Sequence, residues 1–148
     1  MIKQIIVLRK DLNMRKGKMV AQGAHASMKV FFDRKMDRLG GYRVSEYLEA
    51  ADGRPEFPED TQSLLAIPLS RDMAEWVNGA FTKICVGCNS EAELLELLSK
   101  AQEAGLPCAA IQDMGATEFH GVPTYTALAI GPADSSKIDP ITGHLSLL

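Results

Sequence analysis

The chain has 148 residues, of which 46% are hydrophobic and 24% are charged. This length suits one domain with one core, and the composition excludes an intrinsically disordered protein and a membrane-spanning one, since no apolar run approaches about 18 residues. The net charge of −3 excludes a protein coated with positive charge, but residues 1–38 carry ten basic and three acidic side chains, whereas residues 39–148 carry six basic and sixteen acidic ones. We therefore expect positive charge to be concentrated at one site.

The first part of the chain predicts a strand, a long helix and an irregular excursion. β-Branched and apolar residues fill positions 2–8, as in a buried strand. Residues 16–38 contain no proline and repeat apolar and small residues at helical spacing. Residues 39–69 are interrupted by Gly40-Gly41 and by three prolines, so we expect an inserted excursion there, with room for one short helix at about 44–51.

The rest of the chain predicts strands that alternate with helices. Strands are expected at residues 81–86, about 108–111 and 124–130, and helices after Ser70 and at residues 91–104, the latter capped by Ser90 with Glu93. Gly131-Pro132 is expected to end the last strand, and a turn-rich tail follows. This order indicates an α/β fold in a single domain, residues 1–148, with a mixed, mainly parallel four-stranded sheet and helices on both faces. In such sheets ligands bind just beyond the strand ends.

Three cations stand where the long helix is expected to begin, at Arg15, Lys16 and Lys18. A helix dipole is positive at this end, so each cation costs a few tenths to about 1 kcal/mol unless an anion binds nearby. Gly17 would allow a phosphate to approach the backbone N–H groups closely. The segment predicts either an anion site or a solvated turn whose lysines point apart. It is not a P-loop, because the first glycine and the Ser or Thr of that motif are absent.

Two further groups of polar residues lie near strand ends. Asp113, Gly115 and Thr117 follow the third expected strand, in a kind of loop that often carries ligands, although Asp-x-Gly is also common in ordinary turns. Thr124 and Thr126 project from one face of the last strand. These two hydroxyls either line a site or face solvent.

The cysteines give little support to a metal or redox site. Cys85 and Cys88 have the spacing of half a zinc ribbon, but only Cys108 remains as a further thiol and no paired histidine spacing accompanies them. An odd number of cysteines and the absence of a signal sequence predict reduced thiols and a cytoplasmic protein without metal. His25 falls among small residues of the long helix, where a half-buried imidazole is expected.

Several motifs occur in a fixed order along the chain and span both of its ends. They are the segments from Lys3 to Leu12, from Met14 to Gln22 with His25-Ala26, from Gly105 to Pro107, from Ile111 to Gly115, from Leu128 to Pro132, and from Ile141 to Leu148. Together they resemble one family, the archaeal and eukaryotic type of peptidyl-tRNA hydrolase.

The resemblance implies a compact sheet flanked by helices, often a homodimer, with no metal or organic cofactor. It implies hydrolysis of the ester that joins a peptide to the terminal ribose of tRNA. Its active-site positions correspond to Lys16, Asp113, Thr117 and Thr126: Lys16 would stabilise the oxyanion or bind the terminal phosphate, Asp113 would orient or deprotonate water, and the threonines would hold water or the peptide carbonyl. Contacts to tRNA are expected from Lys10, Arg15, Gly17, Lys18, Gln22, His25 and Thr124.

Two other functions remain open at the level of sequence. Residues 39–69 are longer than the corresponding connection in typical members of the family, and their acidic, proline-rich character is able to cover, reshape or obstruct the tRNA face. The first alternative is therefore a non-catalytic tRNA-binding or translation-associated module of the same fold. The second is a thiol or metal protein built on Cys85 and Cys88.

Overall fold

The computed structural model describes residues 1–50 and 57–148, which fall into two compact units. Unit 1 comprises Met1–Val30 and Leu69–Leu148, and unit 2 comprises Phe31–Pro68. Within the described residues, no helix combines the length and the apolar character that crossing a membrane requires.

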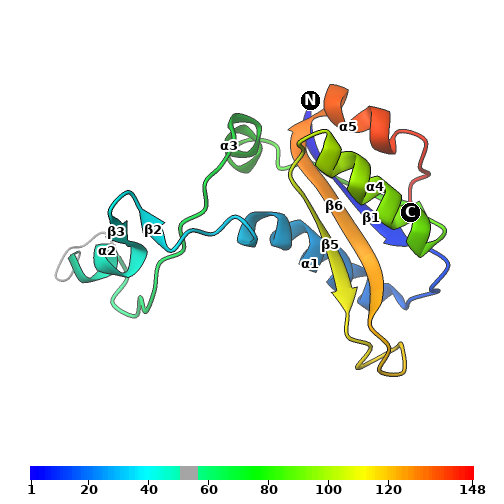
Figure 1. The fold of residues 1–148 in the computed structure, drawn as a ribbon, viewed down its shortest axis with the longest axis horizontal. Helices are drawn as coiled ribbons and strands as arrows, with labels where there is room; N and C mark the ends of the chain where they lie inside the picture. Colours follow the sequence, from blue (N-terminus) through cyan, green and yellow to red (C-terminus); the bar gives the residue numbers. More distant parts are fainter. Residues whose placement is uncertain (51–56) are drawn as a thin grey trace. The chain divides into compact units, whose positions relative to one another are not determined.

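Unit 1 is built on a four-stranded sheet with the strand order β4-β1-β6-β5, of which Figure 1 labels β1, β6 and β5. Its strands are β1 (Ile2–Arg9), β4 (Lys83–Cys88), β5 (Cys108–Asp113) and β6 (Thr124–Asp134). β1 pairs in parallel with β4, and β6 pairs antiparallel with both β1 and β5. Three strands therefore run in one direction, as expected for a mixed sheet with a parallel majority. Only one of the three pairings is parallel, because the reversed strand β6 lies between β1 and β5.

Helices cover both faces of this sheet, which confirms the expected α/β architecture. Helix α4 (Glu91–Glu103) and helix α5 (Ser135–Thr142) form a buried core with the side of β1 that carries Ile5 and Val7. Ile6 points to the other face, where it meets helix α1 (Lys16–Phe32) at Gly23. A Cβ on Gly23 would lie 3.4 Å from the Ile6 side chain, so this small residue lets α1 approach the sheet closely. Helix α3 (Arg71–Asn78) packs against β1 and β6.

Two elements at the carboxyl end of the chain differ from the prediction. β6 does not stop at Gly131-Pro132 but continues to Asp134, because the sheet register shifts there, opposite Gln4. A proline lacks an N–H, and an irregular point in a ladder is where that loss matters least. Helix α5 replaces the expected turn-rich tail: Asp134 caps it by accepting a hydrogen bond from the backbone N–H of Ser136 at 2.9 Å. Burial of its isoleucines outweighs the cost of an internal proline.

Unit 2 contains a hairpin of β2 (Arg38–Leu39) and β3 (Tyr42–Arg43), followed by the short helix α2 (Val44–Ala50). Gly40-Gly41 forms the two-residue turn between the strands, with Gly40 at φ +62, a conformation that favours glycine. The expected excursion at about 39–69 overlaps this unit, although its residues 51–56 lie outside the described part of the chain. Helix α1 ends at Phe32, earlier than the predicted Arg38.

Candidate active site

Five polar side chains from α1, β5, β6 and the β5–β6 loop form one hydrogen-bonded cluster at the carboxyl end of β5. Lys18 Nζ donates to Asp113 Oδ2 at 2.6 Å and to Thr117 Oγ1 at 2.9 Å. Gln22 Nε2 donates to the same Asp113 oxygen at 3.2 Å, and the hydroxyl of Thr126 donates to Gln22 Oε1. We call these five residues the Lys18–Asp113 cluster. It joins the first turns of α1 to β5, to β6 and to the loop between those two strands.

The local structure of each element explains why these side chains meet. Lys18 and Gln22 are four residues apart on α1, so they lie on the same face of the helix. Asp113 is the last residue of β5, where the chain turns away from the sheet. Its Oδ1 accepts a hydrogen bond from the backbone N–H of Gly115 at 2.7 Å, which fixes the start of the loop. Gly115 has φ +80, and a Cβ there would lie 2.6 Å from the carbonyl oxygen of Val122.

The electrostatic environment keeps Asp113 ionised. Its hydrogen bond from Lys18 lowers the pKa of the carboxyl below the ordinary value of 3.8, the Gly115 N–H acts in the same direction, and burial opposes them more weakly. The side chains of Lys18 and Asp113 are 13% and 15% exposed, so the ion pair is largely shielded from water. A general base would require a raised pKa. This geometry therefore suits Asp113 to positioning neighbouring groups rather than to removing a proton from water.

The cluster borders a surface pocket of about 330 Å³. Lys18, Gln22 and His25 line it from successive turns of α1, and Asp113 and Thr117 line it from the end of β5 and from the loop that follows. Thr126, by contrast, is completely buried and reaches the pocket only through Gln22. A ligand can therefore contact Lys18 and Thr117 directly, whereas Thr126 acts on it through Gln22.

The β5–β6 loop is also tied to the start of α1. Arg15 Nε donates to Glu118 Oε1 at 2.8 Å, although the Arg15 side chain remains 80% exposed. Lys18 Nζ lies 5.6 Å from the centre of the Phe119 ring, within the range of a cation–π interaction. Two of the cations at the start of α1 thus interact with the β5–β6 loop, Arg15 with the carboxylate of Glu118 and Lys18 with the ring of Phe119.

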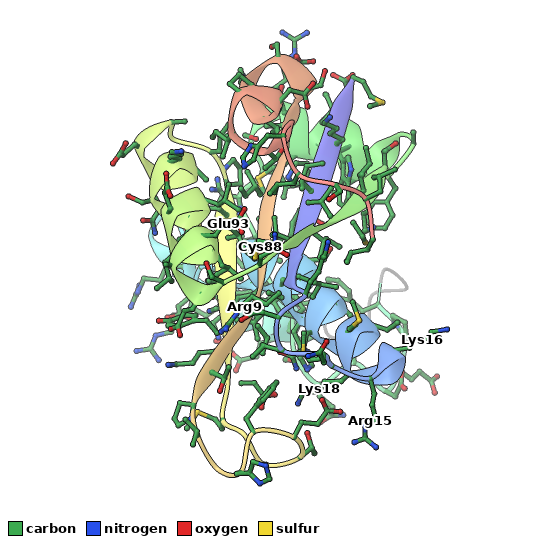
Figure 2. The ribbon with its side chains drawn as sticks, turned by 90° about the vertical axis from the view of Figure 1, so that its right-hand side faces the viewer. Arg9, Arg15, Lys16, Lys18, Cys88 and Glu93 are labelled. Carbon is green, nitrogen blue, oxygen red and sulfur yellow. The ribbon has the colours of Figure 1, made fainter. Side chains whose placement is uncertain are left out.

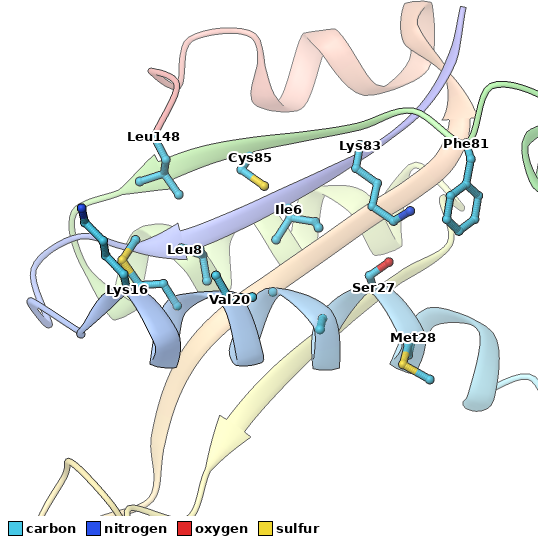
Figure 3. Close-up of a pocket in the computed structure, with 13 residues that line it drawn as sticks. Ile6, Leu8, Lys16, Val20, Ser27, Met28, Phe81, Lys83, Cys85 and Leu148 are labelled. Carbon is cyan, nitrogen blue, oxygen red and sulfur yellow. The ribbon is translucent and has the colours of Figure 1, made fainter.

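Lys16, which was expected to face the reaction, lies away from the cluster. Lys16 and Lys18 leave α1 in different directions (Figure 2), as expected for residues about 200° apart around a helix. Lys16 lines one end of a second hollow, an apolar groove of about 700 Å³ between α1 and β4 (Figure 3). Lys83 lies near the other end of this groove. The spacing of Lys18 and Gln22 was the signal in the sequence that could have identified the actual partner of Asp113.

The remaining residues expected to contact tRNA lie outside the cluster. Lys10 is exposed on the turn after β1, and Thr124 uses its hydroxyl to donate to the carbonyl of Val122 at 2.9 Å. Gly17 is exposed, and a Cβ added there would meet no atom within 4 Å. The fold itself therefore does not require a glycine at position 17.

The structure does not favour a thiol or zinc site at Cys85 and Cys88. Because the two residues are three apart on β4, their side chains point to opposite faces of the sheet. Cys88 packs in the core beneath α4 (Figure 2), and burial raises the pKa of its thiol to about 11, so it is not a thiolate at neutral pH. Among residues 1–50 and 57–148, no three His, Cys, Asp or Glu side chains gather in a way that could hold a metal ion.

Comparison with known proteins places the chain in a family. The family model described as Peptidyl-tRNA hydrolase PTH2 matches residues 2–148. A peptidyl-tRNA hydrolase of Methanocaldococcus jannaschii is 38% identical, covering 99% of this chain and 100% of the relative. The enzymes of that name from Aeropyrum pernix and Halobacterium salinarum are 38% and 35% identical, covering 98% and 99% of this chain and 94% and 99% of the relatives. The predicted resemblance is thus confirmed, and the chain belongs to the peptidyl-tRNA hydrolase PTH2 family.

Proposed function

We propose that the chain hydrolyses the ester bond of peptidyl-tRNA, or of an N-blocked aminoacyl-tRNA, at the Lys18–Asp113 cluster. The observation that carries this proposal is the ammonium group of Lys18, held 2.6 Å from Asp113 and 2.9 Å from Thr117 at the wall of a pocket. Family membership supplies the reaction, and this geometry supplies a cation and a hydroxyl where the ester can reach them.

The reaction requires stabilisation of a negative charge and transfer of one proton. The oxygen of a water molecule forms a bond to the ester carbonyl carbon, and negative charge develops on the carbonyl oxygen. Lys18 stabilises that charge, as preorganised donors do at other acyl-transfer sites. The bond to the ribose oxygen then breaks, and the proton released by the attacking water neutralises the ribose oxygen. Thr117 accepts a hydrogen bond from Lys18, so its own O–H is available to donate to the carbonyl or the water.

The other members of the cluster act as positioning residues. Asp113 holds the ammonium of Lys18 and the amide of Gln22 with one carboxylate oxygen. Thr126 fixes which way the Gln22 amide points, because its hydroxyl donates to the Gln22 oxygen and leaves the NH₂ group for Asp113. This division of roles replaces the sequence-based assignment of Lys16 to the oxyanion.

We further propose that exposed cations on the turn after β1 and at the start of α1 bind the tRNA backbone in the cytoplasm. Arg15 keeps most of its guanidinium in contact with solvent, and Lys10 and Lys16 are exposed. Contacts of this kind are independent of sequence and weaken as salt is added. Gly17 lies between Lys16 and Lys18 in the sequence, where a phosphate could approach the backbone.

A homodimer formed through the groove between α1 and β4 is also part of the proposal. Val20, Met28 and Phe81 line this groove and are 73%, 53% and 51% exposed. Exposed apolar side chains that gather in one place mark interaction surfaces. Light scattering on the purified protein should give twice the mass of one chain, and Val20→Glu should give a monomer. A wild-type monomer at high concentration contradicts this assembly.

The activity is tested by peptide release from N-blocked aminoacyl-tRNA with a chelator present. Lys18→Met and Lys16→Met remove the same charge from the same helical turn and thus form a matched pair. We expect Lys18→Met to lower kcat roughly 100-fold or more, and Lys16→Met to leave it within about threefold. Normal turnover by Lys18→Met would contradict the site. Salt-sensitive tRNA binding by the wild type without any turnover would instead support the non-catalytic module.

A further inference from the structure

Two arginines face each other across the hairpin of unit 2. The Gly40-Gly41 turn sets the register, so that Arg38 on β2 is the direct partner of Arg43 on β3. Directly opposed residues of an antiparallel pair project from the same face, where like charges are destabilising. An isolated hairpin with two residues in each strand is at best marginally stable, so even a small repulsion matters. Stability alone therefore does not account for this pair.

The same two arginines line a pocket with a third cation. Lys35, Arg38 and Arg43 border a hollow of about 530 Å³, and Asp37 is the single carboxylate-bearing residue among the described residues that line it. In the described part of the chain, none of the three cations forms an ion pair. Arg38 Nη1 donates to the neutral carbonyl of Gly41 at 3.2 Å. The pocket thus keeps an excess of positive charge.

The positive charge at this pocket is opposite in sign to the net charge of unit 2. Residues 31–68 contain five basic and eight acidic side chains, and three of the five basic ones line this pocket. A solvated surface would be expected to follow the acidic average of the segment. The concentration of cations at one hollow indicates a specific anion.

We propose that the pocket of Lys35, Arg38 and Arg43 binds a phosphodiester of the tRNA backbone. A planar guanidinium fork binds phosphate oxygens through paired hydrogen bonds, and two forks side by side converge on one phosphate. A bound anion also removes the repulsion between the opposed arginines. The identity of the anion as tRNA phosphate rests on the proposed function, whereas the presence of an anion site rests on the hairpin and its pocket.

The first test measures how salt affects the binding of full-length tRNA. Arg38→Gln with Arg43→Gln removes two charges from the pocket, and Arg71→Gln with Lys100→Gln removes two exposed charges of unit 1 as a matched control. We expect the pocket variant to bind tRNA about 5- to 20-fold more weakly, with a salt dependence shallower by about 1 in the log–log slope. The control should resemble the wild type. Unchanged affinity and slope in the pocket variant would overturn the proposal.

The second test separates this site from the catalytic cluster. For full-length N-blocked aminoacyl-tRNA, the pocket variant should raise KM with kcat unchanged, and with a short oligonucleotide ester as substrate it should match the wild type. An equal loss on both substrates would overturn the assignment, because it would indicate general damage. Lys35→Gln, which leaves the hairpin intact, should weaken tRNA binding in the same direction. Should the wild type hydrolyse neither substrate, the proposed function fails, while the binding measurements still decide on the phosphate pocket.

A third measurement distinguishes RNA phosphate from free phosphate. Calorimetry with inorganic phosphate reports whether a small anion occupies the pocket by itself. Arg38→Lys with Arg43→Lys retains the charge but loses the planar fork, so we expect it to restore only part of the tRNA affinity. Binding of inorganic phosphate without any effect of these variants on tRNA would overturn the assignment to RNA.

Discussion

Asp113 accepts hydrogen bonds from Lys18, Gln22 and the backbone N–H of Gly115, and these bonds stabilise its negative form. Its ionisation should therefore limit activity only in acid. Because its pKa is depressed in the folded protein, the negative form is present above the ordinary value of 3.8 and is lost only as the pH falls through the lower folded value. We expect kcat/KM to show no loss attributable to Asp113 between about pH 8 and about pH 5. NMR titration of the Asp113 carboxyl, alongside the pH–rate profile, measures this directly. A folded pKa above the ordinary value would restore the role of general base.

At Gly17, the addition of one methyl group should affect tRNA binding without lowering stability. A Cβ at this position would extend into open space, and alanine is a better helix former than glycine by up to about 1 kcal/mol. We expect Gly17→Ala to leave the free energy of unfolding unchanged or slightly raised, yet to weaken tRNA binding because the methyl group keeps a phosphate from the backbone. Urea denaturation and filter binding measure the two effects. A variant that binds tRNA normally would show that no phosphate approaches there.

The neighbouring lysines show what could be predicted at single residues and what could not. The sequence placed a basic turn at the start of α1 and a carboxylate at the end of β5, and the structure joins these two segments. The sequence alone could not show which of Lys16 and Lys18 faces Asp113, since both belong to the same helical turn. Helix geometry decides between them: Lys18 shares a face with Gln22 and points to Asp113, whereas Lys16 points to the apolar groove.

At the scale of elements, the β5–β6 loop depends on glycines that differ in how closely they are packed. Gly115 and Gly121 both have positive φ, but only at Gly115 would a Cβ collide with the backbone, near Val122. We expect Gly121→Ala to cost about 1 kcal/mol of unfolding free energy for its φ alone, and Gly115→Ala about 2 kcal/mol or more. Gly115→Ala should also lower kcat, because its N–H anchors Asp113. Equal effects on stability and kcat in the two variants would show that the crowding at Gly115 does not matter.

Elements with strong local signals were predictable, and those determined by distant contacts were not. Helix α4 begins where its cap stands, with Ser90 accepting a hydrogen bond from the backbone N–H of Glu93 at 3.1 Å. The continuation of β6 through Gly131-Pro132 depends on the register shift opposite Gln4, which lies at the other end of the chain. Helix α5 is stabilised by the burial of its isoleucines against the sheet. Local propensity predicted a turn there because of Pro140, and it could not take this distant packing into account.

At the scale of the whole molecule, the basic first quarter of the chain serves more than one purpose. Four of its cations pair with carboxylates inside unit 1: Lys3 with Asp139, Arg9 with Asp11, Arg15 with Glu118 and Lys18 with Asp113. Two others, Lys35 and Arg38, line the pocket of unit 2. The charge asymmetry of the sequence therefore corresponds to internal ion pairs, a proposed catalytic lysine and a proposed anion pocket, a distribution that charge counting alone could not resolve.

Because the chain divides into two units, deletion of unit 2 tests whether unit 1 alone folds and catalyses the reaction. The core cluster between the sheet, α4 and α5 lies wholly within unit 1, as does the Lys18–Asp113 cluster. We expect a chain in which ten Gly and Ser residues, able to span about 33 Å, replace residues 31–68 to unfold cooperatively and to hydrolyse a short oligonucleotide ester within about threefold of the wild-type kcat. Its affinity for full-length tRNA should fall at least as far as that of the pocket variant. Calorimetry and kinetics on both substrates measure these effects. Loss of cooperative unfolding would show that unit 1 needs residues 31–68 to fold, and unchanged tRNA affinity would show that unit 2 has no part in binding tRNA.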